Sequence, residues 1–173
     1  AILVTWQPGQ EAGNAVADVL SGEVNPSGKL TETFPVRYKD SPSYGNFPGS
    51  KETVYYGEGI YVGYRYYDTK GIKTQYPFGY GLSYTTFKYS NMKLNANTLN
   101  TEKNDKIKIS VDITNTGKVK GKEVVQLYIT QNMSSVDRPE KELKGFLETK
   151  ETVISGGTIA GNTRKEIEEK TGK

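Results

Sequence analysis

The first part of the chain changes from a continuous apolar run to a helical period. Residues Ile2–Gln7 are mostly apolar and end at Pro8-Gly9, which predicts a short buried strand followed by a turn. The next apolar residues recur at i, i+3, i+4, i+7 and i+8, the spacing of one helix face. These positions are Ala12, Ala15, Val16, Val19 and Leu20. Gly22 follows them, where a left-handed residue ends a helix at low cost.

A second strand is predicted where apolar and polar residues alternate over Lys29–Phe34. With the preceding strand and helix it completes a strand–helix–strand unit over residues 1–34. Such a unit is typical of an α/β layer, and a single unit cannot cover both faces of a parallel sheet. We therefore expect residues 1–34 to be one piece of a larger α/β layer.

Proline and glycine interleave with aromatic residues between positions 35 and 60. The breaks are Pro35, Pro42, Gly45, Pro48, Gly49, Gly57 and Gly59, and the aromatic residues are Tyr38, Tyr44, Phe47, Tyr55 and Tyr56. Because flexible linkers are poor in aromatic residues, this pattern predicts a long ordered loop. The segment Tyr61–Asp68 is strand-like, with tyrosines on both faces, and Pro77–Gly81 predicts a further turn.

From residue 85 onward the pattern has the period of β-strands. Phe87–Leu94 predicts one strand, and Ile107–Ile113, where isoleucine and valine alternate with polar residues, predicts a half-buried second strand. Asn115–Gly117 turns the chain, and Val124–Ile129 predicts a third strand. Strands at ~10–15-residue spacing indicate the first half of a β-sandwich.

The tail, residues 151–173, has a different character. Glycines interrupt it, and Thr163 followed by Glu166 fits a capping box at the start of a short polar helix over Arg164–Lys170. Only Ile167 in that helix is apolar, so it would be marginal by itself.

Composition limits the chemistry that this chain can perform. Apolar residues make up 34%, whereas Gly (19) and Tyr (13) are abundant, a turn-rich and aromatic-rich composition that favours β structure. Neither Cys nor His is present, which excludes disulfides, Ser-His-Asp and Cys-His catalysis, and His-based zinc sites. The net charge of +3 is too small to indicate nucleic acid or an anionic membrane as a partner.

Isolated acidic residues offer weak candidates for a site. Glu11 lies at a strand-to-helix junction, where it would either line a ligand site or stabilise the helix N-terminus. Glu58 lies between two glycines in the aromatic loop, and we do not expect it to act as an acid or base. The acidic residues near turns of the β part lack the ligand spacing of a calcium loop; these are Asp105, Asp112, Glu123 and Asp137. No metal or cofactor is expected.

The aromatic residues of the loop are the candidate substrate-binding residues. Tyr44, Phe47, Tyr55 and Tyr56 would either stack on a sugar ring or dock on a neighbouring domain, since Tyr buries area while keeping its hydroxyl hydrated. The later tyrosines are expected to pack at an interface, with Arg65 as a stacked or paired cation among them; they are Tyr61, Tyr64, Tyr66 and Tyr67.

A series of motifs, taken in order, resembles one known family. The stretches are Trp6–Gly13, Asn25–Leu30 with Thr33–Pro35, Tyr56–Asp68, Pro77–Phe87, Val111–Gly117, Gly121–Tyr128 and Arg138–Phe146. Their order and spacing over residues 1–147 resemble the C-terminal part of family 3 glycoside hydrolases, in particular bacterial β-glucosidases. Each motif alone is a weak signal, and the ordered series is specific.

The resemblance implies a mixed α and β fold built from parts of two modules. Residues 1–34 would be the terminal strand–helix–strand of an α/β sandwich, and residues 35–84 an aromatic-rich connection. Residues 85–150 would be a partial fibronectin type III-like, immunoglobulin-like antiparallel β-sandwich, and residues 151–173 a divergent tail. A barrel module precedes these parts in the family and would be the structural partner of this chain, together with the rest of the α/β module.

The resemblance also implies that the catalytic groups lie elsewhere. The family cleaves β-glycosidic bonds with retention, using an Asp nucleophile on the barrel and a Glu acid/base earlier in the α/β sandwich. No position of this chain matches either motif, so no catalytic residue is assigned here. The chain is thus expected to be a scaffold part of a β-glucosidase-like enzyme that acts on β-linked glucosides or oligosaccharides.

Two alternatives remain open at this point. The chain would otherwise be a standalone β-sandwich module that binds carbohydrate or protein, or a non-functional truncated or chimaeric product, as the divergence after Lys150 suggests. The absence of Cys and of a recognisable signal peptide slightly favours the cytoplasm.

The purified chain is expected not to hydrolyse an aryl β-glucoside, because retaining hydrolysis needs two carboxyl groups ~5–5.5 Å apart. Release of the aryl alcohol, followed by absorbance, measures this directly. Turnover well above a buffer control would show that the catalytic groups have been placed in the wrong part of the family.

Overall fold

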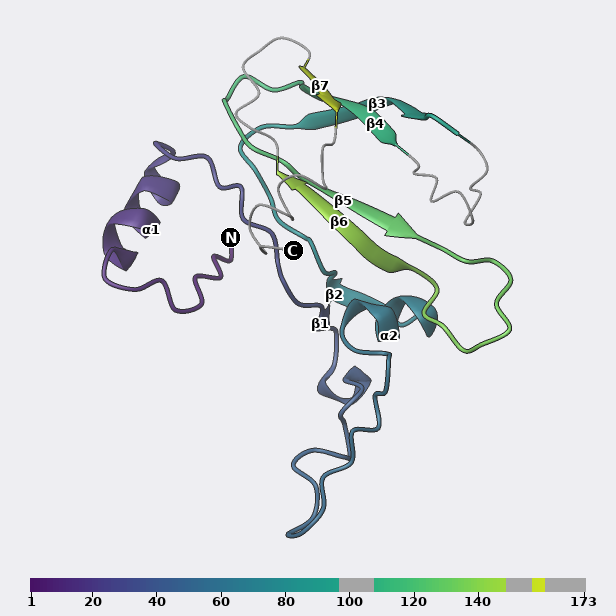
Figure 1. Ribbon diagram of the computed structural model, residues 1–173. Coiled ribbons are helices and arrows are strands. Elements are labelled where there is room, and N and C mark those ends of the chain that lie inside the picture. The colour runs from purple at the N-terminus through teal and green to yellow at the C-terminus, as the bar shows by residue number, and fades with distance from the viewer. Residues whose placement is uncertain (97–107, 149–156, 161–173) are drawn as a thin grey trace, which may run out of the picture. The chain divides into compact units, whose positions relative to one another are not determined.

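The computed structural model describes residues 1–96, 108–148 and 157–160. Its helices are α1 (Ala12–Ser21) and α2 (Tyr64–Thr69), with a 3-10 turn at Tyr38–Asp40. Its strands are β1 (Phe34–Pro35), β2 (Thr74–Tyr76), β3 (Phe87–Leu94), β4 (Ile109–Asn115), β5 (Val124–Ile129), β6 (Glu142–Glu148) and β7 (Gly157–Ala160) (Figure 1). Within the described residues, neither helix is long and apolar enough to cross a membrane.

The chain forms two compact units, each assembled from separate stretches of sequence. Of the described residues, the first unit contains 1–27, those between 82 and 123, 148 and 157–160, and so holds α1 and the sheet β3–β4–β7. The second unit contains residues 28–81 and 124–147, and so holds α2 and the two-stranded sheets β1–β2 and β5–β6. The module boundaries drawn from the sequence at residues 34, 84 and 150 remain a prediction.

Helix α1 is confirmed where the apolar spacing placed it. Gly22 at its C-terminus has φ 85°, a left-handed conformation that glycine adopts without a Cβ penalty. Its backbone N–H donates to the carbonyl of Val19 at 3.2 Å. Glu11, at the other end, accepts a hydrogen bond from Asn14 Nδ2 at 2.7 Å. Glu11 thus has a local structural partner at the helix N-terminus.

The predicted strand Ile2–Gln7 is wrong, because these residues form no strand and remain exposed. Ile2 is 76% exposed and Val4 43%. A strand needs a neighbour to satisfy its backbone N–H and C=O groups, and no described strand pairs with this segment. This apolar run could form a buried strand only beside a neighbouring strand, and the described residues offer none for it.

The sheet of the first unit confirms the β pattern after residue 85. Strands β3 and β4 are antiparallel, with Tyr89 opposite Ile113, and β7 pairs antiparallel with the other edge of β4. Ile113 is 1% exposed and lies at the centre of the core. Strand β7 falls in the tail, where no strand was predicted, and the predicted helix Arg164–Lys170 and Asp105 lie outside the described residues.

A buried polar cluster fixes the turn after β4. Thr85 Oγ1 donates to Asn115 Oδ1 at 2.6 Å, and the Gly117 backbone N–H donates to the same oxygen at 3.0 Å. Asn115 Nδ2 in turn donates to the carbonyl of Val119 at 2.8 Å. Thr85 and Asn115 are 7% and 8% exposed, so these bonds satisfy groups that would otherwise be costly to bury.

One amide side chain joins the segment after α1 to the start of the β part. Asn25 Oδ1 accepts from Ser83 Oγ at 3.0 Å and from the Tyr84 backbone N–H at 2.8 Å. Asn25 Nδ2 donates to the carbonyl of Lys120 at 3.0 Å, and the Tyr84 hydroxyl donates to the carbonyl of Val19 at 2.7 Å. These contacts hold α1 against the sheet of the first unit.

The predicted strand Lys29–Phe34 is also wrong over most of its length. Only Phe34 lies in a strand, in the short pair β1–β2. The Leu30 backbone N–H instead donates to the carbonyl of Tyr80 at 2.8 Å, and the Gly79 N–H donates to the carbonyl of Leu30 at 2.7 Å. The predicted turn at Pro77–Gly81 is confirmed, and it pairs with Leu30 at a single position.

The predicted strand at Tyr61–Asp68 is replaced by helix α2. Gly63, with φ 61° and ψ −133°, precedes the helix in a conformation that most residues avoid. Tyrosine favours strands, but Tyr64 and Asp68 are spaced i, i+4 and both contact the same neighbouring hairpin. Tertiary contacts therefore decide the conformation of this segment against its local preference.

Replacing Gly121 by alanine is expected to destabilise the first unit by about 1–3 kcal/mol. A Cβ at this position would lie 2.7 Å from Asn25 Nδ2 and 2.8 Å from Thr85 Cγ2, so the polar links described above would have to move. Denaturant unfolding measures the change. Gly13→Ala is the matched control, because a Cβ there meets nothing within 4 Å and alanine favours the helix. Equal stability of the two variants would contradict the packing at Gly121.

Candidate functional site

The predicted substrate-binding aromatics lie on a long, narrow loop. This aromatic loop, residues 41–62, extends away from β1 and β2 within the second unit (Figure 1). It closes on itself at its tip, where the Ser50 backbone N–H donates to the carbonyl of Thr53 at 2.9 Å. Further in, Asn46 Nδ2 donates to the carbonyl of Tyr55. The loop is therefore ordered by its own hydrogen bonds, as its composition predicted.

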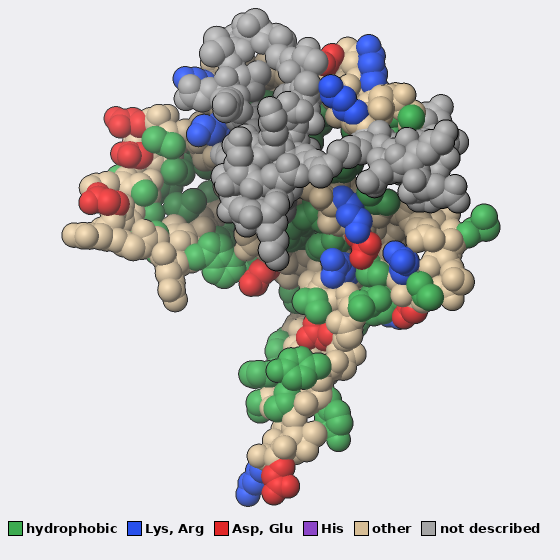
Figure 2. Space-filling view, viewed as in Figure 1, with side chains coloured by type: hydrophobic (Ala, Val, Ile, Leu, Met, Phe, Trp, Pro, Cys, Tyr) green, Lys and Arg blue, Asp and Glu red, His purple; other side chains and the backbone are tan. Residues whose placement is uncertain are grey.

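The aromatic side chains of this loop are largely exposed. Phe47 is 73% exposed, Tyr55 69% and Tyr56 93%. Tyr44 is 55% exposed and its ring meets that of Tyr38 edge-on, with the centroids 5.3 Å apart. In Figure 2, hydrophobic side chains line this projecting segment, and a basic and an acidic side chain lie at its end.

The Asn46–Tyr55 hydrogen bond brings three of the four candidates together. Phe47 follows Asn46 on one side of the loop, and Tyr55 and Tyr56 lie on the returning side. Such a group of exposed aromatic residues is suited to binding either a sugar ring or another protein surface. Their role in binding substrate remains a prediction.

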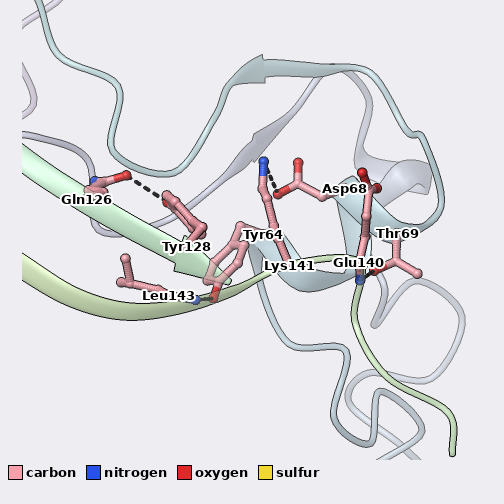
Figure 3. Close-up of polar contacts among 8 residues, drawn as sticks. All are labelled: Tyr64, Asp68, Thr69, Gln126, Tyr128, Glu140, Lys141 and Leu143. Carbon is pink, nitrogen blue, oxygen red and sulfur yellow. Dashed lines mark hydrogen bonds and ion pairs between the residues drawn. The ribbon is translucent and has the colours of Figure 1, made fainter. Parts of the chain in front are cut away.

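A second cluster joins helix α2 to the hairpin β5–β6 (Figure 3). The Tyr64 hydroxyl accepts a hydrogen bond from the Leu143 backbone N–H at 2.7 Å. One turn later, Asp68 Oδ2 lies 3.1 Å from Lys141 Nζ. Thr69 Oγ1 accepts from the backbone N–H of residue 140 at 3.0 Å. Three consecutive contacts therefore align one side of α2 with the start of β6.

Aromatic rings fill the space beside these polar contacts. The Tyr64 ring lies 5.2 Å from that of Phe78 and 5.7 Å from that of Tyr128, the latter edge-on. Lys141 Nζ lies 5.3 Å from the centroid of Tyr128, within cation–π range. The Tyr128 hydroxyl donates to Gln126 Oε1 at 2.7 Å, as the close-up shows (Figure 3).

The pKa is raised for two tyrosines, Tyr128 in this cluster and Tyr61 in the aromatic loop. Burial, with smaller contributions from Tyr64 and Asp68, raises the pKa of Tyr128 above its ordinary value. The hydrogen bond to Asp137 is the main cause that raises the pKa of Tyr61. Neutral phenols can donate hydrogen bonds at every pH at which the protein would ordinarily be studied.

A small cavity lies at the centre of the second cluster. Its volume is about 50 Å³, and its lining includes the Asp68–Lys141 ion pair. The lining residues are Thr33, Tyr64, Asp68, Thr74, Pro77, Phe78, Tyr128 and Lys141. Most of them come from α2, β2 and the hairpin, so the cavity lies beside the same contacts that join these elements.

Several acidic side chains of the described residues pair with neutral or basic groups. Asp68 is paired with Lys141, and Asp112 accepts a hydrogen bond from Asn91 Nδ2 at 2.8 Å. Glu58 is half-buried within the aromatic loop and has no carboxylate partner there. Across residues 1–96, 108–148 and 157–160, no group of three or more metal-ligating side chains gathers.

The comparisons with known proteins identify the class to which this arrangement belongs. A model of the glycosyl hydrolase family 3 C-terminal domain matches residues 1–64. A model of a fibronectin type III-like domain matches residues 123–151. The chain belongs to the C-terminal region of family 3 glycoside hydrolases, which confirms the resemblance and the mixed fold class inferred from the motifs.

Particular relatives are β-glucosidases. The chain is 56% identical over 146 residues to thermostable beta-glucosidase B of Acetivibrio thermocellus, covering 84% of this chain and 19% of that protein. It is 50% identical over 150 residues to beta-glucosidase BoGH3A of Bacteroides ovatus, covering 84% and 20%. The chain thus spans about a fifth of the length of the curated relatives it matches.

A solved structure agrees in fold. Beta-glucosidase 3B from Thermotoga neapolitana, determined in complex with glucose, superposes with a TM-score of 0.82 at 45% identity. The match covers 90% of this chain and 22% of that protein. The similarity therefore extends over both units of the described chain and concerns a minor part of a much longer enzyme.

The sequence predicted the tyrosines of the cluster but missed their partners. Tyr64 and Tyr67 pack within the second unit, and Arg65 lies over the Tyr64 ring at 6.0 Å; their predicted packing at an interface stays a prediction. Lys141 and Tyr128 were not singled out as partners of α2. The i, i+4 spacing of Tyr64 and Asp68 was the available signal, since it places both on one helix face and would have favoured a helix.

Tyr64→Phe is expected to destabilise the second unit by about 1–3 kcal/mol, because it leaves the half-buried Leu143 N–H without its acceptor. Tyr66→Phe is the control, since the Tyr66 hydroxyl makes no hydrogen bond within the described residues, although its ring contacts Tyr67 at 5.4 Å. Hydrogen exchange at the Leu143 amide should accelerate in the first variant only. Unchanged exchange would contradict the role of this hydroxyl.

Proposed function

We propose that this chain serves as a non-catalytic, C-terminal supporting part of a β-glucosidase that hydrolyses β-linked glucosides. The observation that carries the proposal is the continuous match to β-glucosidases over 84% of the chain but about a fifth of each relative. The barrel and the rest of the α/β sandwich would then supply the reacting groups.

The chain's contribution would be to present the aromatic loop from a rigid base. The contacts of α2 with the β5–β6 hairpin fix the base, and the loop projects from the same unit. Tyr44, Phe47, Tyr55 and Tyr56 are proposed to contact a sugar unit of the substrate at the edge of the site. Their exposure supports a binding role, since large exposed aromatic groups mark binding surfaces.

Docking of the same loop on a neighbouring module is the second candidate for these residues. Val54, 57% exposed, and Ile60, 48% exposed, lie beside the aromatic residues and favour it, because aliphatic side chains add apolar contact area without the stacking faces that sugars use. A standalone module that binds carbohydrate through this loop is the remaining alternative, and it differs because it needs no catalytic partner.

Exchange of the matching segment tests the supporting role. This chain replaces the corresponding 146-residue segment of the Acetivibrio thermocellus enzyme, and hydrolysis of an aryl β-glucoside is measured. We expect the chimaera to keep activity within about tenfold of the parent, because the reacting groups are untouched. The parent lacking the segment is the control. A soluble, folded chimaera without activity would contradict the proposal.

Alanine substitutions in that chimaera separate the two roles of the loop. If the aromatic residues contact sugar, Tyr55→Ala with Tyr56→Ala raises KM about 5-fold or more while the unfolding temperature stays unchanged, since stacking on each ring is worth ~0.5–1.5 kcal/mol. Lys51→Ala at the loop tip is the control. A lowered unfolding temperature with an unchanged KM would assign the loop to docking instead.

A further inference from the structure

The cavity between α2, β2 and the β5–β6 hairpin is too small for an organic ligand. Its volume of about 50 Å³ lies well below the ~300 Å³ at which ordinary small-molecule pockets begin. A water molecule needs only ~10–15 Å³ of such space. The size of the cavity therefore excludes a sugar ring and admits water.

One polar group at the lining of the cavity, the Thr33 hydroxyl, lacks a hydrogen-bond partner among the described protein groups. Thr33 lines the cavity, and its Oγ1 is closed to bulk solvent with no hydrogen-bond partner among the described residues. A buried hydroxyl without a partner costs free energy, so native proteins almost always satisfy such groups with protein or ordered water.

The same cavity offers the further partners that a buried water requires. An ordered water typically makes two to four hydrogen bonds. The Asp68 carboxylate accepts and the Lys141 ammonium donates, and these two groups lie 3.1 Å apart at the lining. Thr74 adds a hydroxyl from β2. Because one group is anionic and its neighbour cationic, the cavity favours a neutral, dipolar occupant over a free ion.

We propose that this cavity is a structural hydration site, in which ordered water bridges Thr33 Oγ1 to the Asp68–Lys141 ion pair. The water satisfies the threonine hydroxyl and extends the ion pair toward β1 and β2. It thereby connects three stretches of the second unit that are distant in sequence: the segment before β1, helix α2 and the start of β6. The site would stabilise the base from which the aromatic loop projects, independently of whether that loop binds sugar.

Thr33→Val tests the proposal, because a hydrated hydroxyl and a dry hydroxyl predict different changes in the midpoint of thermal unfolding. Valine has nearly the shape of threonine without the hydroxyl. If water bridges the hydroxyl, the substitution removes a hydrogen-bond partner from buried water, and the midpoint of thermal unfolding falls by about 2–6 °C. If the hydroxyl is dry and unpaired, valine relieves its burial and the midpoint stays equal or rises, which overturns the proposal.

Thr33→Ser is the matched control, since it keeps the hydroxyl and loses only the methyl group. If hydration is the cause, the midpoint of thermal unfolding should fall less for this variant than for Thr33→Val. An equal or larger fall of the midpoint would assign the effect to packing and overturn the proposal.

A high-resolution crystal structure of the unsubstituted chain gives a second measurement that needs no variant. Electron density for water ~2.6–3.2 Å from Thr33 Oγ1 is expected. An empty cavity at that resolution would overturn the proposal.

Discussion

The second unit depends on the contacts between a short helix and a two-stranded hairpin. Helix α2 has six residues and is too short to be stable in isolation. The sheet β5–β6 has two strands, which is too few for a sheet to be stable by itself. The hydrogen bond from the Leu143 amide to the Tyr64 hydroxyl and the Asp68–Lys141 ion pair join them. Each element supplies the partner that the other lacks, so their stability is mutual.

The sequence predicted best those elements in which apolar residues recur with a regular helix or strand period. Strands β3 to β5 and helix α1 have clear periods, and their positions were found within a few residues. The predictions failed at Ile2–Gln7, Lys29–Phe34 and Tyr61–Asp68, where distant parts of the chain decide the conformation. The segment at Tyr61–Asp68 shows this most clearly, because a strand-like composition forms a helix to meet the hairpin.

The sequence predicted which aromatic residues the candidate site contains, but not which residues would contact one another in it. The aromatic loop was expected from the spacing of Pro, Gly and Tyr, and the hydrogen bond from Asn46 to Tyr55 gives it a defined shape. Lys141 and Thr33 could not be found from a single sequence, because neither has a local pattern and each acquires its environment from residues far along the chain. Long-range partners of this kind are visible only once the fold is known.

The ammonium of Lys141 makes two different contacts at once, an ion pair and a cation–π contact. Its ammonium is 3.1 Å from Asp68 Oδ2, 5.3 Å from the Tyr128 ring centroid, and borders a cavity of about 50 Å³. An ammonium is a compact point charge, whereas guanidinium is a broad planar fork that has to be accommodated in full. Exchange of lysine for arginine here would conserve charge but not shape. An arginine at this position would therefore keep the charge but would have to make its contacts with Asp68 and the Tyr128 ring in a different geometry.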